Sequence, residues 1–369
     1  MLTTFSVENF RLFRHIEIAH LGRVNLLVGK NNSGKSAFLE AVTVYASNAS
    51  LRTLQDLIGD REETWNERNQ PAIQRTGDNA IRHLFRGHKI PDFDSPGIVI
   101  GPIGDKSKQL HLLTRAFETV TEEDGTSRRR MLNAAEAADS QGEQEFEIAL
   151  VAQEGDKSRR IVRVDQPGEY LRPSALLSAP EPNYPFQVVP THNMIPTKIA
   201  ALWDMIGLTP MAAEVINGLK LIEPSITGIL FVQNTRDSRM PLASSSNASE
   251  PLPLKSMGDG ITRLFHIIVA LVSARNGILL IDEFENGLHW SVQLAVWKTV
   301  FRLAEHLNVQ VFATTHSRDC VAGFEGAWME HRDTGAFFRL QLDAAGIPAV
   351  KAYSLETLAD SLDTDVEVR

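Results

Sequence analysis

The stretch GKNNSGKS, residues 29–36, decides the fold of this chain. It follows the apolar run VNLLV (24–28), which reads as a buried strand, and precedes AFLEAVTVYAS (37–47), which has the spacing of a buried helix. The stretch matches the pattern G-x-x-x-x-G-K-[ST], and a strand–loop–helix context is the one in which that pattern forms a phosphate-binding loop. The sequence therefore predicts an α/β fold of the P-loop NTPase type.

The residue types in this loop predict contacts with ATP and Mg²⁺. Glycines let backbone N–H groups turn toward phosphate oxygens, and the N-terminus of the following helix adds a partial positive charge. Lys35 is expected to reach the terminal phosphates and the Ser36 hydroxyl to bind Mg²⁺. The predicted nucleotide-binding residues of the loop are Gly29, Asn31, Asn32, Ser33, Gly34, Lys35 and Ser36.

Two further apolar strands end in residues that suit ATP hydrolysis. The strand in GILLIDEFE (277–285) ends at Asp282, where a carboxylate can hold Mg²⁺, and Glu283 follows, where it can orient or deprotonate water. The stretch VQVFATTHS (309–317) places His316 at a third strand end, within reach of a terminal phosphate. A solvated acidic turn and a structural histidine are the alternatives, and the P-loop in the same chain favours catalysis.

Composition limits the class of protein. With 369 residues, one large domain with insertions or two lobes is expected. The apolar fraction of 43% and the mean hydropathy of -0.14 are ordinary for a soluble globular protein. A net charge of -9 argues against a chain that coats nucleic acid with its whole surface, but not against a basic patch. The single cysteine, Cys320, excludes an internal disulfide.

The sequence carries no pattern of a signal peptide or of a membrane span. The most apolar stretch, 261–274, is interrupted by Arg263 and His266 and is too short to cross a bilayer. We therefore expect a cytoplasmic protein without a membrane partner.

Hydrophobic patterning divides the chain into parts. Apolar runs between 97 and 165, with turn sequences EEDGT (122–126) and QEGDK (153–157), predict an antiparallel sheet inserted after the first helix. Helices are expected over 198–206, 210–221, 261–274 and 290–307, and a strand over 226–233. We interpret 1–369 as a single head made of a P-loop part (1–47), an inserted helical and antiparallel β region (48–185), a helical lobe (186–260) and a part with the acidic strand end and the histidine (261–369).

The order of the motifs resembles ABC-type ATPases of the SMC/RecF/OLD group. The P-loop is followed by KSMGDG (255–260), LLIDEFENGLH (279–289) and TTHS (314–317), and the opening 5–36 is similar to that group as well. The resemblance implies an ABC-ATPase head with a helical signature lobe and an inserted antiparallel β subdomain. It also implies a homodimer with ATP between the two copies.

The resemblance assigns roles to particular residues. Ser256, Gly258 and Gly260 would form the signature motif, which contacts the γ-phosphate held by the other subunit. Glu283 would be the catalytic base and His316 the switch histidine, and 287–289 would be the D-loop. The motif SMGDG differs from the transporter signature, and Trp290 stands where the group often has proline. The sequence does not identify the Q-loop glutamine; 188–193 is the region where the topology would put it, with Asn193 as the candidate.

OLD proteins carry a Toprim nuclease domain after the ATPase. About fifty residues follow His316, so we expect no such domain in this chain. Asp363 and Asp365 read as a solvated acidic tail.

Three functions compete. The first is an ATPase that drives a separately encoded effector, such as a nuclease, in antiviral or anti-plasmid defence. The second is a RecF-like ATPase of DNA repair, for which the clusters 128–130 and 157–163 would contact DNA phosphates, although solvated hairpin ends also explain them. The third is a nucleotide-dependent scaffold with little hydrolysis, which an intact Glu283 disfavours. A transporter subunit is disfavoured by the signature and by the large inserted sheet.

Overall fold

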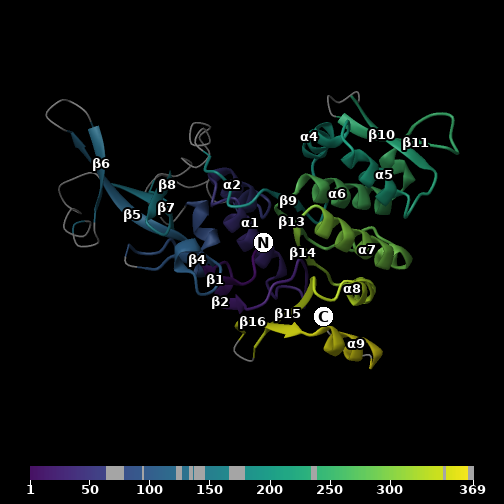
Figure 1. Ribbon diagram of the computed structural model, residues 1–369. Coiled ribbons are helices and arrows are strands. Elements are labelled where there is room, and N and C mark those ends of the chain that lie inside the picture. The colour runs from purple at the N-terminus through teal and green to yellow at the C-terminus, as the bar shows by residue number, and fades with distance from the viewer. Residues whose placement is uncertain are drawn as a thin grey trace.

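The computed structural model describes residues 1–63, 79–93, 95–121, 127–132, 136, 146–165, 179–233, 239–343 and 346–364. In these residues it shows an antiparallel sheet and a helical lobe at opposite ends of the molecule, with helix α1 (Lys35–Ala46) and a central sheet between them (Figure 1). The predicted turn at 122–126 and Asp365 lie outside the described residues.

The central sheet carries the predicted site. Its strand order in the described chain is β16-β15-β3-β14-β13-β9. The parallel strands are β9 (Phe186–Val189), β13 (Ile278–Ile281), β14 (Gln310–Thr314), β3 (Val24–Val28) and β15 (Gly335–Leu342), and β16 (Pro348–Tyr353) is antiparallel to β15. Because parallel strands end on one edge, the segments after β3, β13, β14 and β9 meet there.

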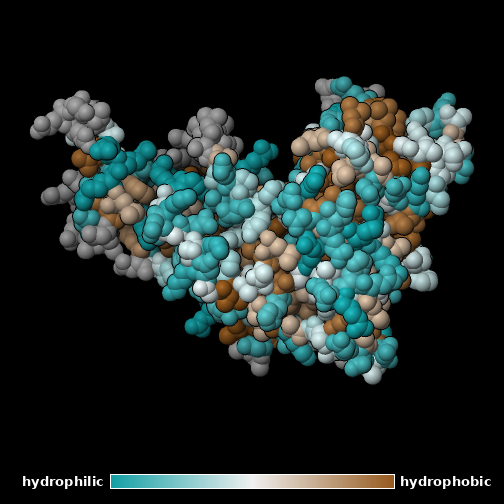
Figure 2. All heavy atoms as spheres, in the orientation of Figure 1, coloured by the Kyte–Doolittle hydropathy of each residue, from teal (hydrophilic) through white to brown (hydrophobic). Residues whose placement is uncertain are grey.

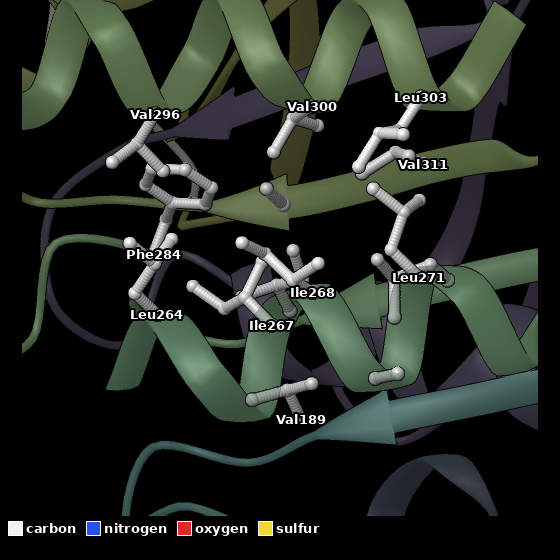
Figure 3. Packing of buried hydrophobic residues seen from close by; sticks show 14 of the residues in the cluster. Val189, Leu264, Ile267, Ile268, Leu271, Phe284, Val296, Val300, Leu303 and Val311 are labelled. Atoms are coloured by element: carbon white, nitrogen blue, oxygen red, sulfur yellow. The ribbon is translucent and has the colours of Figure 1, made fainter. Parts of the chain in front are cut away.

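Both faces of the central sheet are buried, as its continuous apolar strands predict. One face packs against α6 (Asp259–Ser273), α7 (Trp290–His306) and α8 (Arg318–Glu330), as Figure 3 shows for α6 and α7. Val311 points into that core, whereas its neighbour Phe312 belongs to the core formed with α1 on the opposite face.

The antiparallel sheet begins before the P-loop. In the described residues its order is β2-β1-β4-β5-β7-β8, with β6 paired to β5. Its strands are β1 (Phe5–Phe10), β2 (Phe13–Ile18), β4 (Ile98–Gly101), β5 (Leu110–Thr121), β6 (Ser127–Leu132), β7 (Phe146–Glu154) and β8 (Lys157–Arg163). The sheet expected as an insertion is thus continued by two N-terminal strands. The short helices near it are α2 (Leu51–Gly59), η1 (Ala80–Leu84), η2 (Arg86–His88) and η3 (Lys106–Lys108).

The helical lobe consists of the segment before α6 together with the first residues of α6. It contains α4 (Pro196–Ile206), α5 (Met211–Leu219), β10 (Ile226–Gln233), β11 (Arg239–Ser245), β12 (Leu252–Pro253) and η7 (Leu254–Met257). Figure 2 shows hydrophobic residues gathered on its surface, where Met205, Leu208 and Leu230 are exposed. Within the described chain, every helix is too short or too polar for a membrane span.

Several element boundaries differ from the sequence prediction. The strand of GILLIDEFE ends at Ile281, so Asp282 and Glu283 lie in the turn that follows. The C-terminal part also forms structure that the sequence did not predict, because β15 and β16 extend the central sheet and α9 (Leu355–Asp363) packs on α8. Asp363 is exposed, as expected, but it ends a helix.

Candidate functional site

The P-loop needs glycine at both of its ends. Gly29 has φ 149°, and a Cβ there would lie 2.2 Å from the Leu340 carbonyl oxygen and 2.6 Å from Ser33 Oγ. Gly34 has φ 105°, and a Cβ there would lie 2.7 Å from the ring of Phe13. The loop therefore turns tightly between β3 and α1, which places the N-terminus of α1 against the loop.

Side chains of the loop are arranged for an anion. Asn31 and Asn32 are exposed, whereas Ser33 and Lys35 are buried. Ser33 Oγ has no hydrogen-bond partner in the described residues, and a buried hydroxyl without a partner is costly. A phosphate oxygen in the loop would satisfy that hydroxyl, so the residues present fit a nucleotide.

The Lys35 ammonium lies folded onto the loop. Its Nζ donates to the carbonyl oxygens of Gly29 (2.8 Å) and Lys30 (3.0 Å). Burial lowers the pKa of Lys35, and the negative charges of Asp282, Glu283 and Glu285 oppose that shift. Lys35 thus lies close enough to these three carboxylates for their charges to act on its ammonium group.

Asp282 collects hydroxyl groups from separate segments. Within the described chain, Ser36 Oγ donates to its Oδ2 at 3.0 Å, and Thr314 Oγ1 donates to its Oδ1 at 2.5 Å. Thr191 Oγ1, from the segment after β9, donates to Oδ2 at 3.3 Å. A carboxylate beside a P-loop serine hydroxyl is the oxygen donor set that Mg²⁺ prefers, so Ser36 and Asp282 fit that ion.

Glu283 has an unusual backbone and a supported side chain. Its φ is 50°, in the left-handed region, and its N–H donates to Thr314 Oγ1 at 2.9 Å. Asn286 Nδ2 donates to Glu283 Oε2 at 2.8 Å. His316 Nε2 lies 3.8 Å from Glu283 Oε1, and both side chains are about one-third exposed. The two predicted catalytic groups therefore face one another at the strand ends.

A second acid holds the histidine segment. Glu285 Oε1 accepts a hydrogen bond of 2.7 Å from the main-chain N–H of His316. The turn after β13 and the turn after β14 are thus linked through Glu285 as well as through Thr314.

The motif Ser256–Gly260 adjoins the segment expected to be the D-loop. Gly258 has φ 114° and precedes α6 without a side-chain cap, and Ser256 Oγ donates locally to the Pro253 carbonyl oxygen at 2.7 Å. A Cβ at Gly260 would lie 2.6 Å from the carbonyl oxygen of Gly287. Only glycine allows these two turns to pack so closely.

Sequence reasoning missed Thr191, Asn286 and Arg263, which all contact the Asp282–Glu283 segment. Thr191 lies in the range 188–193 that was singled out only for a Q-loop glutamine. Asn193 from that range accepts a hydrogen bond from Arg263 Nη1 at 3.1 Å. Thr191 and Asn193 lie beside the site because β9 pairs in parallel with β13, which local sequence does not reveal. Asn286 lies only three residues after Glu283, so its spacing in the sequence was a signal that could have found it.

The arginine clusters of the antiparallel sheet are engaged by acids. Arg129 Nε and Arg160 Nε lie 3.1 and 3.2 Å from the same oxygen of Glu147. Arg130 Nε lies 2.6 Å from Glu118. Much of this positive charge is therefore balanced within the sheet.

Comparisons with known proteins identify the family of the chain. The AAA ATPase domain family matches residues 1–125 and 208–321, more than half of the chain. The chain is 22% identical over 355 residues to an "ATP/GTP phosphatase" of Helicobacter pylori, across 87% of this chain and 86% of that protein. It is 32% identical over 107 residues to the DNA replication and repair protein RecF of Nitrosococcus oceani, across 29% of this chain and 26% of that protein.

A solved structure shares the fold. The SMC head bound to the C-winged helix domain of ScpA has a TM-score of 0.50 and 12% identity, over 96% of this chain and 98% of that chain. At this identity the likeness concerns the fold alone. With the family match and the P-loop beside the acidic strand end, the chain belongs to the AAA ATPase domain family and has an SMC head-like P-loop ATPase fold.

Proposed function

We propose that this ATPase hydrolyses Mg²⁺-bound ATP between two copies of the chain and uses the cycle to drive a separately encoded effector. The observation that carries the proposal is the cluster in which Ser36, Asp282 and Glu283 lie together with His316. This cluster contains groups suited to phosphate binding, to metal binding and to the activation of water.

Each group has a role in binding. Gly29, Asn31, Asn32, Ser33, Gly34 and Lys35 would surround the phosphates, and Ser36 and Asp282 would hold Mg²⁺. Bound Mg²⁺ neutralises charge on the β- and γ-phosphates. Lys35 would exchange its two carbonyl acceptors for phosphate oxygens.

Glu283 is positioned for general-base catalysis. It would accept a proton from water as the water oxygen bonds to the γ-phosphorus and the bond to the ADP oxygen breaks. Asn286 holds one carboxylate oxygen, which leaves the oxygen nearer His316 for the water. His316 would donate to the transferring phosphoryl group.

The second copy would complete the site. Ser256 and the N–H groups at the uncapped start of α6, with Gly258 and Gly260, form an end that favours an anion. We expect the γ-phosphate bound to the P-loop of a second copy to bind at this end, which would produce an ATP-dependent homodimer.

The test is ATP turnover by the wild type and by Glu283→Gln, with mass followed by light scattering. We expect the variant to lose turnover by a factor of about 100 or more and to accumulate as an ATP-bound dimer. Glu330→Gln, which changes an exposed ion pair with Lys298, is the matched control and keeps wild-type turnover. Wild-type turnover in Glu283→Gln would refute the role of Glu283, and the absence of any wild-type turnover would favour the scaffold.

The RecF-like match supports DNA repair as the second candidate. The engagement of Arg129, Arg130 and Arg160 by glutamates favours an effector protein over DNA as the partner. Turnover measured with and without duplex DNA separates them: stimulation by DNA favours repair. Unchanged turnover with DNA, together with copurification of a nuclease encoded beside this gene, favours effector control in defence.

A further inference from the structure

Arg263 is a buried cation in the second turn of α6. It is one of the largest fully buried side chains in the described residues, and 1% of its surface is exposed. In the described residues its Nη1 donates to the Pro190 carbonyl oxygen (2.6 Å) and to Asn193 Oδ1 (3.1 Å). These acceptors are uncharged and belong to the segment after β9.

The other end of the same guanidinium holds the acidic strand end. Arg263 Nη2 donates to the main-chain carbonyl oxygens of Asp282 (2.6 Å) and Glu283 (2.9 Å). One side chain thus joins α6, the segment after β9 and the segment after β13. Lysine cannot reproduce this, because its single ammonium lacks the planar fork that serves two pairs of acceptors.

Arg263 keeps its positive charge although it is buried. Burial lowers the pKa of Arg263 to about 10, and the negative charges of Asp282, Glu285 and Glu283 oppose that shift. The guanidinium therefore stays protonated at neutral pH, when its hydrogen bonds to carbonyl oxygens are strengthened by charge.

The backbone that Arg263 holds is strained. A left-handed φ at a residue with a Cβ costs on the order of 1 kcal/mol or more, so the surrounding contacts must fix it. At Glu283, where φ is 50°, the N–H donates to Thr314 Oγ1 and the carbonyl accepts from Arg263. Arg263 therefore holds the carbonyl group of Glu283, and Thr314 holds its N–H group. Together the two contacts fix the backbone from which the Glu283 side chain extends.

Apolar packing couples the same segments. Leu264, next to Arg263, and Phe284, which follows Glu283, belong to the same buried core (Figure 3). Phe284 stacks on Trp297 of α7 with a ring separation of 3.8 Å. At the start of α6, Gly260 abuts the Gly287 carbonyl oxygen. A displacement of the start of α6 would therefore be transmitted to the backbone before Glu283 and to the backbone after it.

We propose that Arg263 is a positioning residue for ATP hydrolysis, which ties the main chain of Glu283 to α6 so that occupation of the motif Ser256–Gly260 orients the Glu283 carboxylate. The inference rests on the proposed roles of Glu283 and of that motif. In a dimer, the nucleotide on the P-loop of one copy would then orient the base of the other copy, which makes hydrolysis cooperative in ATP.

The experiment compares Arg263→Lys with Arg159→Lys. Arg159 is a matched control because it is also desolvated and donates to main-chain carbonyl oxygens, those of Asn48 (2.7 Å) and Ala49 (3.4 Å), away from the strand ends. For each variant, kcat, KM, the Hill coefficient for ATP, the Kd of a fluorescent ATP analogue and the melting temperature are measured.

We expect Arg263→Lys to lower kcat by a factor of about 10 to 100, since small misplacement of a catalytic group has such effects. The Kd of the analogue should change by a factor of less than about 3, and the Hill coefficient should fall to about 1. Arg159→Lys should keep the wild-type kcat and Hill coefficient.

Asn193→Gly is the second variant, because glycine retains the left-handed backbone at φ 68° and removes one acceptor of Arg263. It should lower kcat by a factor of about 3 or more at unchanged Kd, and it decides the matter should Arg263→Lys not fold. A wild-type kcat in either folded variant, with only the melting temperature lowered, would overturn the proposal. Persistence of turnover in Glu283→Gln would instead mark failure of the proposed function itself.

Discussion

The hydroxyl of Ser36 donates to both carboxylate oxygens of Asp282, at 3.0 and 3.3 Å, although 246 positions separate the two residues. The contact joins the first turn of α1 to the end of β13. It places the two groups that suit Mg²⁺ side by side, so binding of the ion requires little reorganisation of the protein.

Removal of the Ser36 hydroxyl should impair metal-dependent turnover. We expect Ser36→Ala to lower kcat/KM for ATP by roughly 100-fold, because Asp282 would then lack its partner in holding Mg²⁺. Ser36→Thr keeps the hydroxyl and should remain within about 5-fold of the wild type, as the P-loop pattern allows either residue. Turnover measured against Mg²⁺ concentration checks this, and equal behaviour of the two variants would contradict it.

Loss of the Asn286 amide should slow the chemical step. Asn286 Nδ2 donates to Glu283 Oε2 at 2.8 Å and to the Thr191 carbonyl oxygen at 3.3 Å. We expect Asn286→Ala to lower kcat by roughly 10-fold with little change in KM, since the amide orients the base and does not bind ATP. Asn247→Ala, at an exposed asparagine whose side chain accepts a hydrogen bond from Ser246 Oγ at 3.4 Å, is the control in the same steady-state assay. A raised KM at constant kcat would show a binding role instead.

A side chain at Gly29 should disturb both stability and nucleotide binding. The Cβ of Gly29→Ala would lie 2.2 Å from the Leu340 carbonyl oxygen at a φ of 149°. We expect a loss of about 2 kcal/mol or more in the free energy of unfolding and a weaker affinity for ATP. Gly228→Ala is the control, because a Cβ there meets nothing within 4 Å. Urea denaturation and ATP titration of the two variants test the prediction, and equal stability would refute it.

Acid should destabilise the protein through His266. Burial, and then the charge of Arg263, lower the pKa of His266 from 6.5 to about 4, and its Nδ1 accepts the Met194 N–H at 3.1 Å. Between these values the unfolded chain binds a proton that the folded chain does not. The free energy of unfolding should therefore fall by about 3 kcal/mol as pH drops from 6.5 to 4.

The measurement is urea denaturation across that pH range for the wild type, His266→Asn and His15→Asn. Asparagine at 266 keeps an acceptor for Met194 but does not titrate, so its curve should be flatter than that of the wild type by this amount. His15 is exposed and serves as the control. Parallel curves for the wild type and His266→Asn would contradict the assignment.

Local sequence was sufficient for the P-loop. Because GKNNSGKS and its flanking strand and helix are contiguous, backbone geometry and side-chain chemistry are fixed together, and the α/β fold could be predicted from 24–47. The same holds for the apolar strand before Asp282 and for α6 and α7. The observed ends of both helices lie within two residues of the predicted ends. Periodicity and burial are local signals for such elements.

Contacts between distant strands could not be read in this way. The antiparallel sheet includes β1 and β2, and the central sheet gains β15 and β16, because strand pairing depends on partners far along the chain. For the same reason no local pattern predicts that Thr191 reaches Asp282 or that Arg263 is buried against the strand ends.

The P-loop pattern at 29–36 and the acid pair at 282–283 can be recognised from the sequence alone, since each lies in contiguous residues. The long-range support of Glu283 depends instead on the tertiary structure. Thr314 and Arg263 reach Glu283 because β13 and β14 are parallel neighbours with α6 packed on their face, and that arrangement is set by the packing of the whole core.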